Sequence, residues 1–481
     1  MYKYVNAWKN IRFESAGIRR PGATDEVVEL VNEARRDGLK LKPFGGRHSF
    51  NNIVKTRGLL VDLSRMNQVL GVDPVRGTAS LQGGIVLRDA IAGLDARGLH
   101  FPSLGSYSDQ SISGVIATST HGSTLHHGTF SDLVVGVEAV LSDGSVINLT
   151  GDDPRLKAFR TSLGQLGIVT RVDIACTLAF YLSCAIRPVA EDEGFATIVE
   201  TARAHEYVSM LWLPYVKEAS IRILSRFDAT GRNEIAARRE QAAVHRNRLT
   251  NTLVDVGEYL AGQAFLRFPR WLGRWYSGLI HRAFFDDDGV VDKSYNVFRY
   301  DKYREPTTNH YLRMIFNSEY ALDVAALEAT LRQIREVIST FASRGRCINY
   351  PRIHVRFTQR SDQTLIGLNS GRDTAHVGIY IVASVRHKPQ IPVARAIEQV
   401  MIEHGGRPHW GKYRYVSTEE YKQTYPRLAE LLALRAELDP IGMFSDGVEM
   451  YRDLDNLERP PLRRIFRSLF ASDTYSPVRL L

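Results

Sequence analysis

Apolar residues in the first half of the chain have the spacing of helices separated by short strands. Val27, Leu30 and Val31 recur at helical spacing. We expect this helix to begin at an N-cap Thr24 and to end at Gly38. Further helices are predicted at 84–98 and 152–162. Short apolar runs bounded by turn residues predict strands at 39–42, 58–63, 68–73, 78–82, 133–141, 145–149 and 168–172.

The second half continues in the same mixed manner. Strands are predicted at 208–212, 219–224, 353–357 and 377–385. Helices are predicted at 322–342, 393–402 and 418–437. Side chains alternate along a strand, so His354 and Arg356 are expected on one face of the strand 353–357. The pattern as a whole predicts an α+β fold.

Composition limits the class of protein but does not choose a function. The chain has 481 residues, of which 44% are hydrophobic and 24% charged, as in a soluble globular protein of two or three domains. Its net charge is +9. A moderate excess of positive charge favours the binding of anionic cofactors, acidic substrates or a membrane surface. No zinc-finger or RNA-binding pattern is present, so we expect no nucleic-acid partner.

Cysteine usage and the ends of the chain point to a reducing compartment. Cys176, Cys184 and Cys347 have no disulfide or metal spacing. We find no signal peptide, and no apolar run reaches the roughly 18 residues of a membrane span, so a cytoplasmic location is expected. The acidic run 286–288 lacks the downstream carboxylate of a calcium loop, and we expect no metal site.

The segment 43–51 contains the first candidate chemistry. Gly45 and Gly46 end a predicted strand and let an anion approach backbone N–H groups. His48 follows at the tip of the turn, where it can reach a ligand held there. Alone, this pattern is more often an ordinary turn with a surface histidine.

A second segment, 111–123, is small, rich in hydroxyl groups and without charge before His121. Such a run can wrap closely around a flat ligand that bears phosphate groups. A serine- and threonine-rich loop or edge strand is an equally good explanation of this segment by itself.

Together the two segments resemble the flavin domain of the vanillyl-alcohol oxidase family, in its sugar-oxidising branch of aldonolactone and alditol oxidases. In that branch a G-x-x-H-S motif carries a histidine joined to the flavin, and a T-H-G-S loop lines the cofactor. Three more segments resemble the branch in the same order: L-G-x-L-G-[IV]-[IV]-T at 163–170, G-R-D-T at 371–374 and H-W-G-K at 409–412. The middle, about 225–310, has no clear counterpart.

The resemblance implies a PCMH-type FAD-binding domain at 1–180 and a substrate (cap) domain with a large antiparallel sheet at 181–445. A basic, aromatic insertion is expected at about 225–310. It could be a helical lid over the substrate site, a surface that binds a membrane, or ordinary solvated helices. The tail, 446–481, is expected to pack on the flavin domain. The implied cofactor contacts are Phe44, Gly45, Gly46, Arg47, His48, Ser49, Phe50, Ser111, Ser113, Gly114, Thr118, Thr120, His121, Gly122, Ser123, Gly167, Ile168, Val169, His409 and Lys412.

The same resemblance assigns catalytic roles. His48 is expected to bind FAD covalently, with non-covalent FAD as the alternative. Lys412, helped by His409, would stabilise the negative charge that the flavin gains during reduction. Arg356 would hold a substrate oxygen. His354 stands where related enzymes carry a glutamate, and we hypothesise that it is the base.

The predicted function is therefore an FAD-dependent oxidoreductase that oxidises a CH–OH group of a sugar, polyol or sugar lactone. Oxygen or another acceptor would reoxidise the flavin. The alternative is a membrane-associated flavoenzyme of the same fold that acts on a lipid-linked sugar or another hydrophobic alcohol. A flavin-binding protein without enzymatic activity is a more remote possibility.

Overall fold

The computed structural model describes residues 1–227 except Lys9, then 288–298, 315–348, 352–382, 390–415 and 423–446, with eight single residues between 260 and 275. Most of the predicted insertion 225–310 lies outside these residues, and so does the predicted tail 446–481 apart from Asp446. None of the described helices has the length and hydrophobicity that a membrane span requires.

A small parallel sheet opens the chain and presents the His48 turn. Its strand order is β3 (Gly17–Arg19), β5 (Leu59–Asp62) and β4 (Leu41–Phe44). Helix α1 (Thr24–Arg36) packs Val27, Leu30 and Val31 into the core beside it. A hairpin of β1 (Tyr2–Val5) and β2 (Arg12–Ser15) precedes the sheet.

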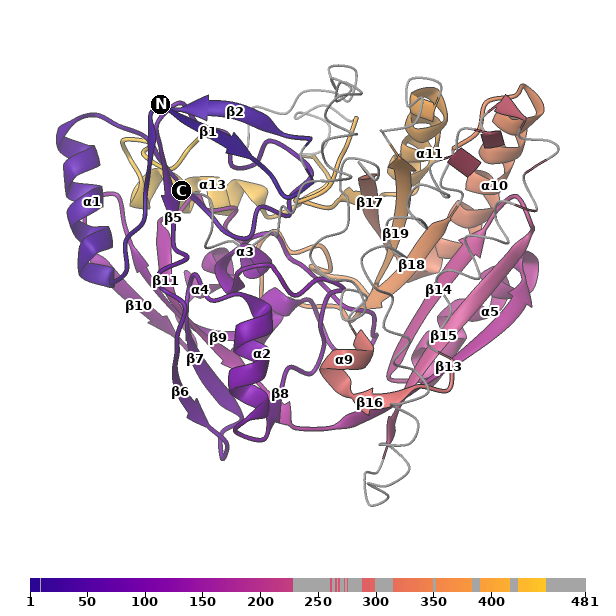
Figure 1. The fold of residues 1–481 in the computed structure, drawn as a ribbon, viewed down its shortest axis with the longest axis horizontal. Helices are drawn as coiled ribbons and strands as arrows, with labels where there is room; N and C mark the ends of the chain where they lie inside the picture. The colour runs from indigo at the N-terminus through magenta and orange to yellow at the C-terminus, as the bar shows by residue number, and fades with distance from the viewer. Residues whose placement is uncertain are drawn as a thin grey trace.

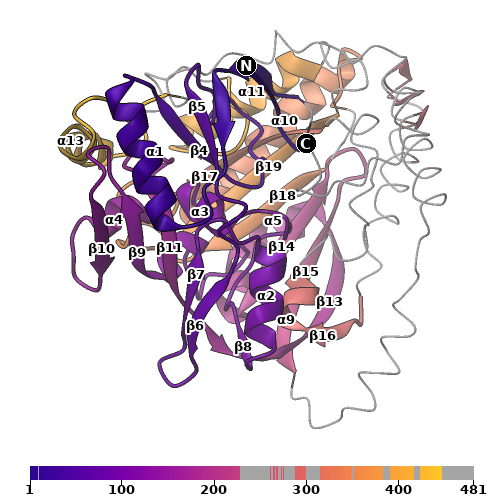
Figure 2. The same ribbon diagram turned by 60° about the vertical axis from the view of Figure 1, so that its left-hand side comes forward.

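A five-stranded antiparallel sheet follows, beside α1 and α2 in Figures 1 and 2. Its strand order is β10 (Val146–Thr150), β9 (Val134–Val140), β11 (Ile168–Ala175), β7 (Thr78–Gln82) and β6 (Val69–Asp73). The helical segments here are α2 (Leu87–Asp95), α3 (Ile112–Ala117), η1 (Phe130–Leu133) and α4 (Leu156–Phe159). Short strands β8 (Leu99–His100) and β12 (Thr177–Leu178) pair with each other.

The rest of the described chain is built on an eight-stranded sheet whose neighbouring strands are all antiparallel. Its order is β16 (Val291–Lys293), β13 (Tyr181–Ala190), β15 (Glu218–Phe227), β14 (Tyr207–Leu213), β18 (Ile353–Thr358), β19 (Thr374–Val382), β17 (Ile315–Asp323) and β20 (Arg407–Pro408). The predicted α+β class with a large antiparallel sheet is confirmed.

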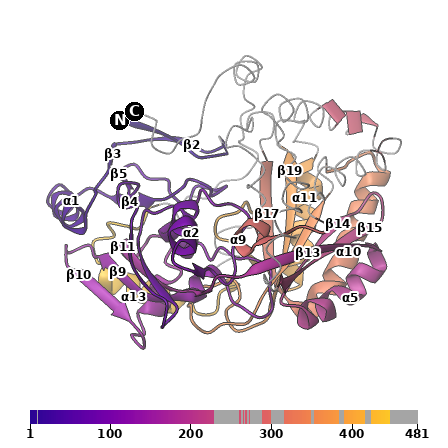
Figure 3. The same ribbon diagram turned by 60° about the horizontal axis from the view of Figure 1, so that its bottom comes forward.

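The two faces of this sheet differ in polarity. Ile353, Val355 and Phe357 of β18 are completely buried in an apolar cluster. That cluster lies beneath α5 (Glu191–Ala204), α10 (Leu327–Ser343) and α11 (Ile391–Glu403), which cover one side of the sheet in Figures 1 and 3. His354 and Arg356 point from the opposite face, as the alternation predicted. Because helices cover the apolar face, the polar face is the one that can contribute side chains to an active site.

Several predicted boundaries are wrong. Thr24 is the first helical residue instead of the N-cap, and its hydroxyl donates to Glu138 Oε1 at 2.9 Å. The segment 111–123 begins with α3, because Ser111 caps the helix by accepting from the Gly114 N–H. The predicted helix 152–162 contains only the single turn α4. The helix predicted from 322 starts at 327, because β17 continues to Asp323.

The last described residues lie along the small parallel sheet. Helix α13 (Leu428–Leu438) precedes them, and the predicted helix start at 418 lies outside the described residues. The Leu41 amide donates to the Met443 carbonyl at 3.0 Å, and Thr56 donates to Asp446 at 2.8 Å. Met443 and Phe444 join the core beneath α1. This segment therefore holds the C-terminal part of the described chain against β4.

Candidate active site

An open cavity, with about 870 Å³ of empty space that includes solvent at its mouth, lies between the turn after β4, the start of α3 and the segment before β11. Of the residues expected to contact FAD, those lining it are Phe44, Gly45, Gly46, Arg47, His48, Ser49, Ser111, Ser113, Gly114, Thr118, Gly167 and Val169. Lys42 and Tyr4 also line it and had not been predicted. No sequence pattern pointed to Lys42, since an alternating strand ordinarily turns its lysines to solvent.

Glycines give this cavity its shape. A Cβ on Gly45 would collide with the Ser111 hydroxyl, and one on Gly46 would collide with the Asp109 carbonyl. The β4 turn therefore touches the chain before α3 so closely that only glycine fits. Backbone N–H groups brought this near a cavity suit a ligand with phosphate groups, as FAD is. The residues present thus fit the implied cofactor.

Gly46→Ala is expected to lower thermal stability and cofactor content together. The added methyl group meets backbone atoms, which cannot move aside as a flexible side chain can. Overpacking of this kind costs about 1–3 kcal/mol. Thermal unfolding and the flavin-to-protein absorbance ratio check the prediction. Gly71→Ala is the matched control, since a Cβ there meets no atom within 4 Å; equal behaviour of the two variants contradicts it.

His48 is held at the edge of the cavity by the N-terminal segment. Trp8 Nε1 donates to the His48 carbonyl at 2.8 Å, and Asn6 donates to the Ser49 carbonyl at 3.0 Å. The Tyr107 ring is stacked on the His48 imidazole with 6.0 Å between centroids. These contacts fix the backbone of the turn, whereas the covalent role of His48 stays a prediction.

The H-W-G-K segment docks directly on the His48 turn. The Phe50 amide donates to the Gly411 carbonyl at 2.8 Å, and Asn51 donates to the Lys412 carbonyl at 2.8 Å. Lys412 Nζ lies 5.0 Å from the centroid of the Phe50 ring. Two motifs far apart in sequence are thereby brought together, and Phe50 contacts the lysine without lining the cavity.

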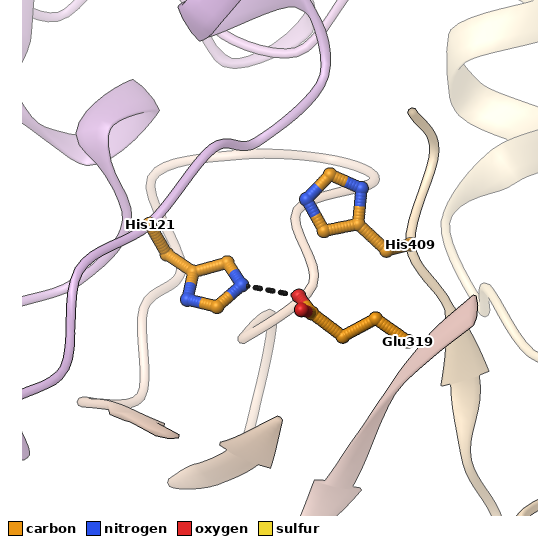
Figure 4. A group of neighbouring side chains, drawn as sticks. All are labelled: His121, Glu319 and His409. Carbon is orange, nitrogen blue, oxygen red and sulfur yellow. Dashed lines mark hydrogen bonds and ion pairs between the residues drawn. The ribbon is translucent and has the colours of Figure 1, made fainter. Parts of the chain in front are cut away.

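Glu319 of β17 lies at the centre of the polar face and contacts several of its side chains. It was not predicted. It is 1% exposed and pairs with Arg356 at 2.5 Å and with His121 at 2.7 Å (Figure 4). In the register of the sheet Glu319 is opposite Gly378, and Gly378 is opposite His354. The missing side chain at Gly378 leaves room between the carboxylate and the histidine. The sequence offered little signal for Glu319, because it follows two other polar residues, Asn317 and Ser318, in the same strand.

The charge state of Glu319 follows from its neighbours. Burial alone would raise the pKa of this carboxyl, but the charge of Arg356 and the hydrogen bond from His121 outweigh it and hold the pKa well below its ordinary value. Glu319 is therefore ionised at neutral pH. Burial lowers the pKa of Lys412 to about 8 while Glu319 opposes that shift, so the ammonium is still mostly charged at pH 7.

The histidines around Glu319 form a layer. His121 stacks on His376 with centroids 3.5 Å apart, and its Nδ1 lies 3.0 Å from the Gly122 carbonyl. His376 Nε2 lies 2.9 Å from the Thr358 hydroxyl. The structure thus places His121 against the carboxylate, outside the cavity lining, and adds His376 to the site.

Ligand-type atoms of His121, Glu319 and His409 lie within 4.8 Å of one another (Figure 4). That spacing would suit a metal ion. However, Glu319 already pairs with the Arg356 guanidinium, and the Lys412 ammonium acts on the same carboxylate. Two cations beside one carboxylate oppose a third. We therefore interpret the group as a hydrogen-bonding network.

The remaining predicted contacts lie outside the cavity lining. The Ser123 hydroxyl donates to the Val208 carbonyl and accepts from the Phe357 amide at 3.2 Å, which ties this segment to the large sheet. The Thr120 carbonyl accepts from the Phe130 amide at 2.8 Å. Ile168 is buried in the core under α1. The others placed outside the lining are Phe50, His121, Gly122, His409 and Lys412.

Comparison with known proteins agrees with this geometry. Residues 15–150 match the FAD binding domain family. The chain is 27% identical to L-gulonolactone oxidase of Mus musculus over 461 residues, covering 92% of this chain and 98% of that protein. It is 27% identical to L-gulono-1,4-lactone dehydrogenase of Mycobacterium tuberculosis (89% and 94% covered) and 28% identical to alditol oxidase of a Streptomyces species (92% and 97% covered).

Among solved structures, cholesterol oxidase from B. sterolicum superimposes with a TM-score of 0.76 at 18% identity, covering 93% of this chain and 95% of that one. This likeness shows the fold. Residues 172–453 match the D-arabinono-1,4-lactone oxidase family. That match spans more than half of the chain, which therefore belongs to the D-arabinono-1,4-lactone oxidase family and is an FAD-linked oxidoreductase of the vanillyl-alcohol oxidase type.

Proposed function

We propose that this enzyme oxidises a CH–OH group of a sugar, polyol or sugar lactone and that oxygen or another acceptor completes the cycle. FAD, when bound, supplies the hydride acceptor. The observation that carries the proposal is the network of Glu319, Arg356 and Lys412 against the His48 turn. Such a network offers several charged hydrogen-bonding groups to a substrate rich in hydroxyls.

In this proposal Arg356 positions the substrate, and Lys412 stabilises the negative charge that the flavin gains on reduction. Arg356 is positioned by its ion pair with Glu319, and its planar guanidinium suits a substrate oxygen as a charged hydrogen-bond donor. Lys412 is partly buried and provides a positive charge beside Glu319, where a preorganised charge acts more strongly than in water. His409 supports the lysine turn, because its Nδ1 accepts from the Gly411 amide at 3.0 Å.

His354 is the proposed acceptor of the hydroxyl proton. Burial, and then the charges of Arg352 and Arg356, lower its pKa well below the ordinary value, so the ring is neutral at neutral pH. Glu319 opposes that shift and would stabilise the imidazolium once it forms. We expect His354→Ala to lower kcat by about 10²–10⁴-fold. An unchanged rate of anaerobic flavin bleaching in this variant rejects the role.

We propose in addition that His48 binds FAD covalently, since an imidazole is a nucleophile in its neutral form and this one lies at the cavity edge. Acid precipitation of the wild type is then expected to leave the yellow colour in the pellet, and His48→Ala to release it. Ser49→Ala serves as the neighbouring control and should keep the colour in its pellet. Colour in the supernatant of the wild type shows that the cofactor is not covalently bound.

A panel of lactones and polyols tests the reaction itself. Purified holoenzyme is mixed anaerobically with sugar lactones, straight-chain polyols and a long-chain primary alcohol, and bleaching of the flavin is followed. Bleaching by a lactone or polyol is expected. Bleaching by the long-chain alcohol alone would instead support the hydrophobic-alcohol alternative, which rests on the segment 225–310 and has no support among the described residues.

A further inference from the structure

Lys42, in β4, is a buried cation that has no part in the proposed oxidation. It is 1% exposed and lines the cavity at whose edge His48 lies. Lysine is rarely buried to this degree without a paired anion. Among the described residues, the side-chain ammonium has one hydrogen-bond partner, the Leu163 carbonyl at 3.2 Å. An ammonium has three N–H donors, so that bond occupies one of them.

The surroundings of Lys42 compensate its charge only in part. The described residues that line the cavity include the cations Lys42 and Arg47 and no carboxylate. Asp446, in the segment after α13, attracts the ammonium and Arg435 repels it, and Asp446 also accepts a hydrogen bond from the Thr56 hydroxyl at 2.8 Å. Burial has the largest effect and lowers the pKa of Lys42 to about 7. An anion in the cavity would therefore stabilise the charged form of this lysine.

We propose that Lys42 binds the diphosphate of FAD. The diphosphate carries the negative charge of this cofactor at neutral pH, and a lysine ammonium suits phosphate oxygens as a compact point charge. Gly45 and Gly46, whose turn already suits phosphate through backbone N–H groups, line the same cavity as Lys42. The proposal goes beyond the oxidation, because it concerns how the cofactor is retained and holds for any alcohol substrate.

Lys42 also supports one wall of the cavity. Leu163 and Gly164 have left-handed backbone conformations, with φ of 55° and 63°, and both line the cavity. The hydrogen bond from Lys42 to the Leu163 carbonyl holds this turn in place. A lysine with that role alone would change FAD affinity by the same factor at every pH. A lysine that binds the diphosphate makes FAD affinity depend on its own protonation, so the pH dependence separates the two roles.

The expected direction of this pH dependence follows from the charge of the lysine. Burial lowers the pKa of Lys42 to about 7, and a diphosphate beside it would raise that pKa, because the anion favours the ammonium. Below pH 7 the lysine already carries its proton, so FAD affinity is complete. As the pH rises through 7, FAD must bind together with a proton, and its affinity falls.

Equilibrium dialysis of the holoenzyme against FAD at a series of pH values measures the dissociation constant of the cofactor without turnover. Where acid precipitation shows the flavin to be covalent, His48→Ala is the background for every variant. We expect the dissociation constant to rise by about 5- to 10-fold between about pH 7 and pH 8.5. Lys42→Met should raise it by about 10- to 100-fold below pH 7 and should abolish its dependence on pH.

Two further variants keep the result specific. Lys42→Arg keeps its charge over the whole range and should bind FAD without the loss of affinity above pH 7. Lys40→Met removes a lysine that donates to the Gly442 carbonyl and does not line the cavity, and it should keep the pH dependence. A dissociation constant that does not change with pH in the background protein, or an unchanged pH dependence in Lys42→Met, overturns the proposal. If Lys42→Met does not fold, the background protein and Lys42→Arg decide.

Discussion

Lys412→Met is expected to lower kcat by about 10²–10³-fold, the loss typical when one preorganised charge is removed from an active site. Lys412 is partly buried, is held by the contacts between its segment and Asn51, and lies over the Phe50 ring. Methionine keeps most of its volume and removes only the ammonium. Anaerobic stopped-flow bleaching with an active polyol or lactone measures the effect, and flavin content confirms that the cofactor is retained.

The pH profile gives an independent test of the same lysine. The folded-state pKa of Lys412 is about 8, so the charge is present below that pH and lost as the pH rises through it. Activity of the wild type should fall above about pH 8 for this reason. Lys412→Arg keeps its charge over the whole range and should lack that fall. A methionine variant at full rate, or an arginine variant with the wild-type profile, contradicts the role of the lysine.

Local signals in the sequence were sufficient for the cavity. Gly45 and Gly46 mark a turn that only glycine can make, and the small residues after Ser111 mark a close approach of two backbones. Both are properties of a few neighbouring residues, so a pattern can reveal them. The same holds for β18, whose alternation correctly placed His354 and Arg356 on one face.

Glu319 shows why the rest could not be predicted. Its partners Arg356 and His121 are distant in sequence. Arg356 meets it through the strand order β18, β19, β17, and His121 reaches it from the segment after α3. Strand order and register are set by the packing of whole sheets, which no local pattern contains. The same limit explains Thr24, whose hydroxyl donates to Glu138 of another strand instead of capping its own helix.

Glu319→Ala is expected to be the most destabilising of these substitutions, by about 3–5 kcal/mol, because it leaves Arg356 buried without its carboxylate. Urea unfolding of the single variants Glu319→Ala and Arg356→Ala and of the double variant measures the coupling. The double variant should be less destabilised than the sum of the singles by about 0.5–3 kcal/mol. Asp362→Ala, from a pair whose side chains are 60% and 62% exposed, should cost within about 0.5 kcal/mol.

Acid unfolding tests the same Glu319–Arg356 ion pair, because its contribution to stability should fall as the pH is lowered. The pKa of Glu319 lies well below the ordinary 4.5. The stabilisation from its ionised form is therefore complete above about pH 4.5 and is lost as the pH falls towards the folded-state pKa. Glu319→Gln has no such proton to bind, so its stability should fall less steeply than that of the wild type below pH 4.5. Parallel acid-unfolding curves for the two proteins would show that Glu319 is not held ionised by its neighbours.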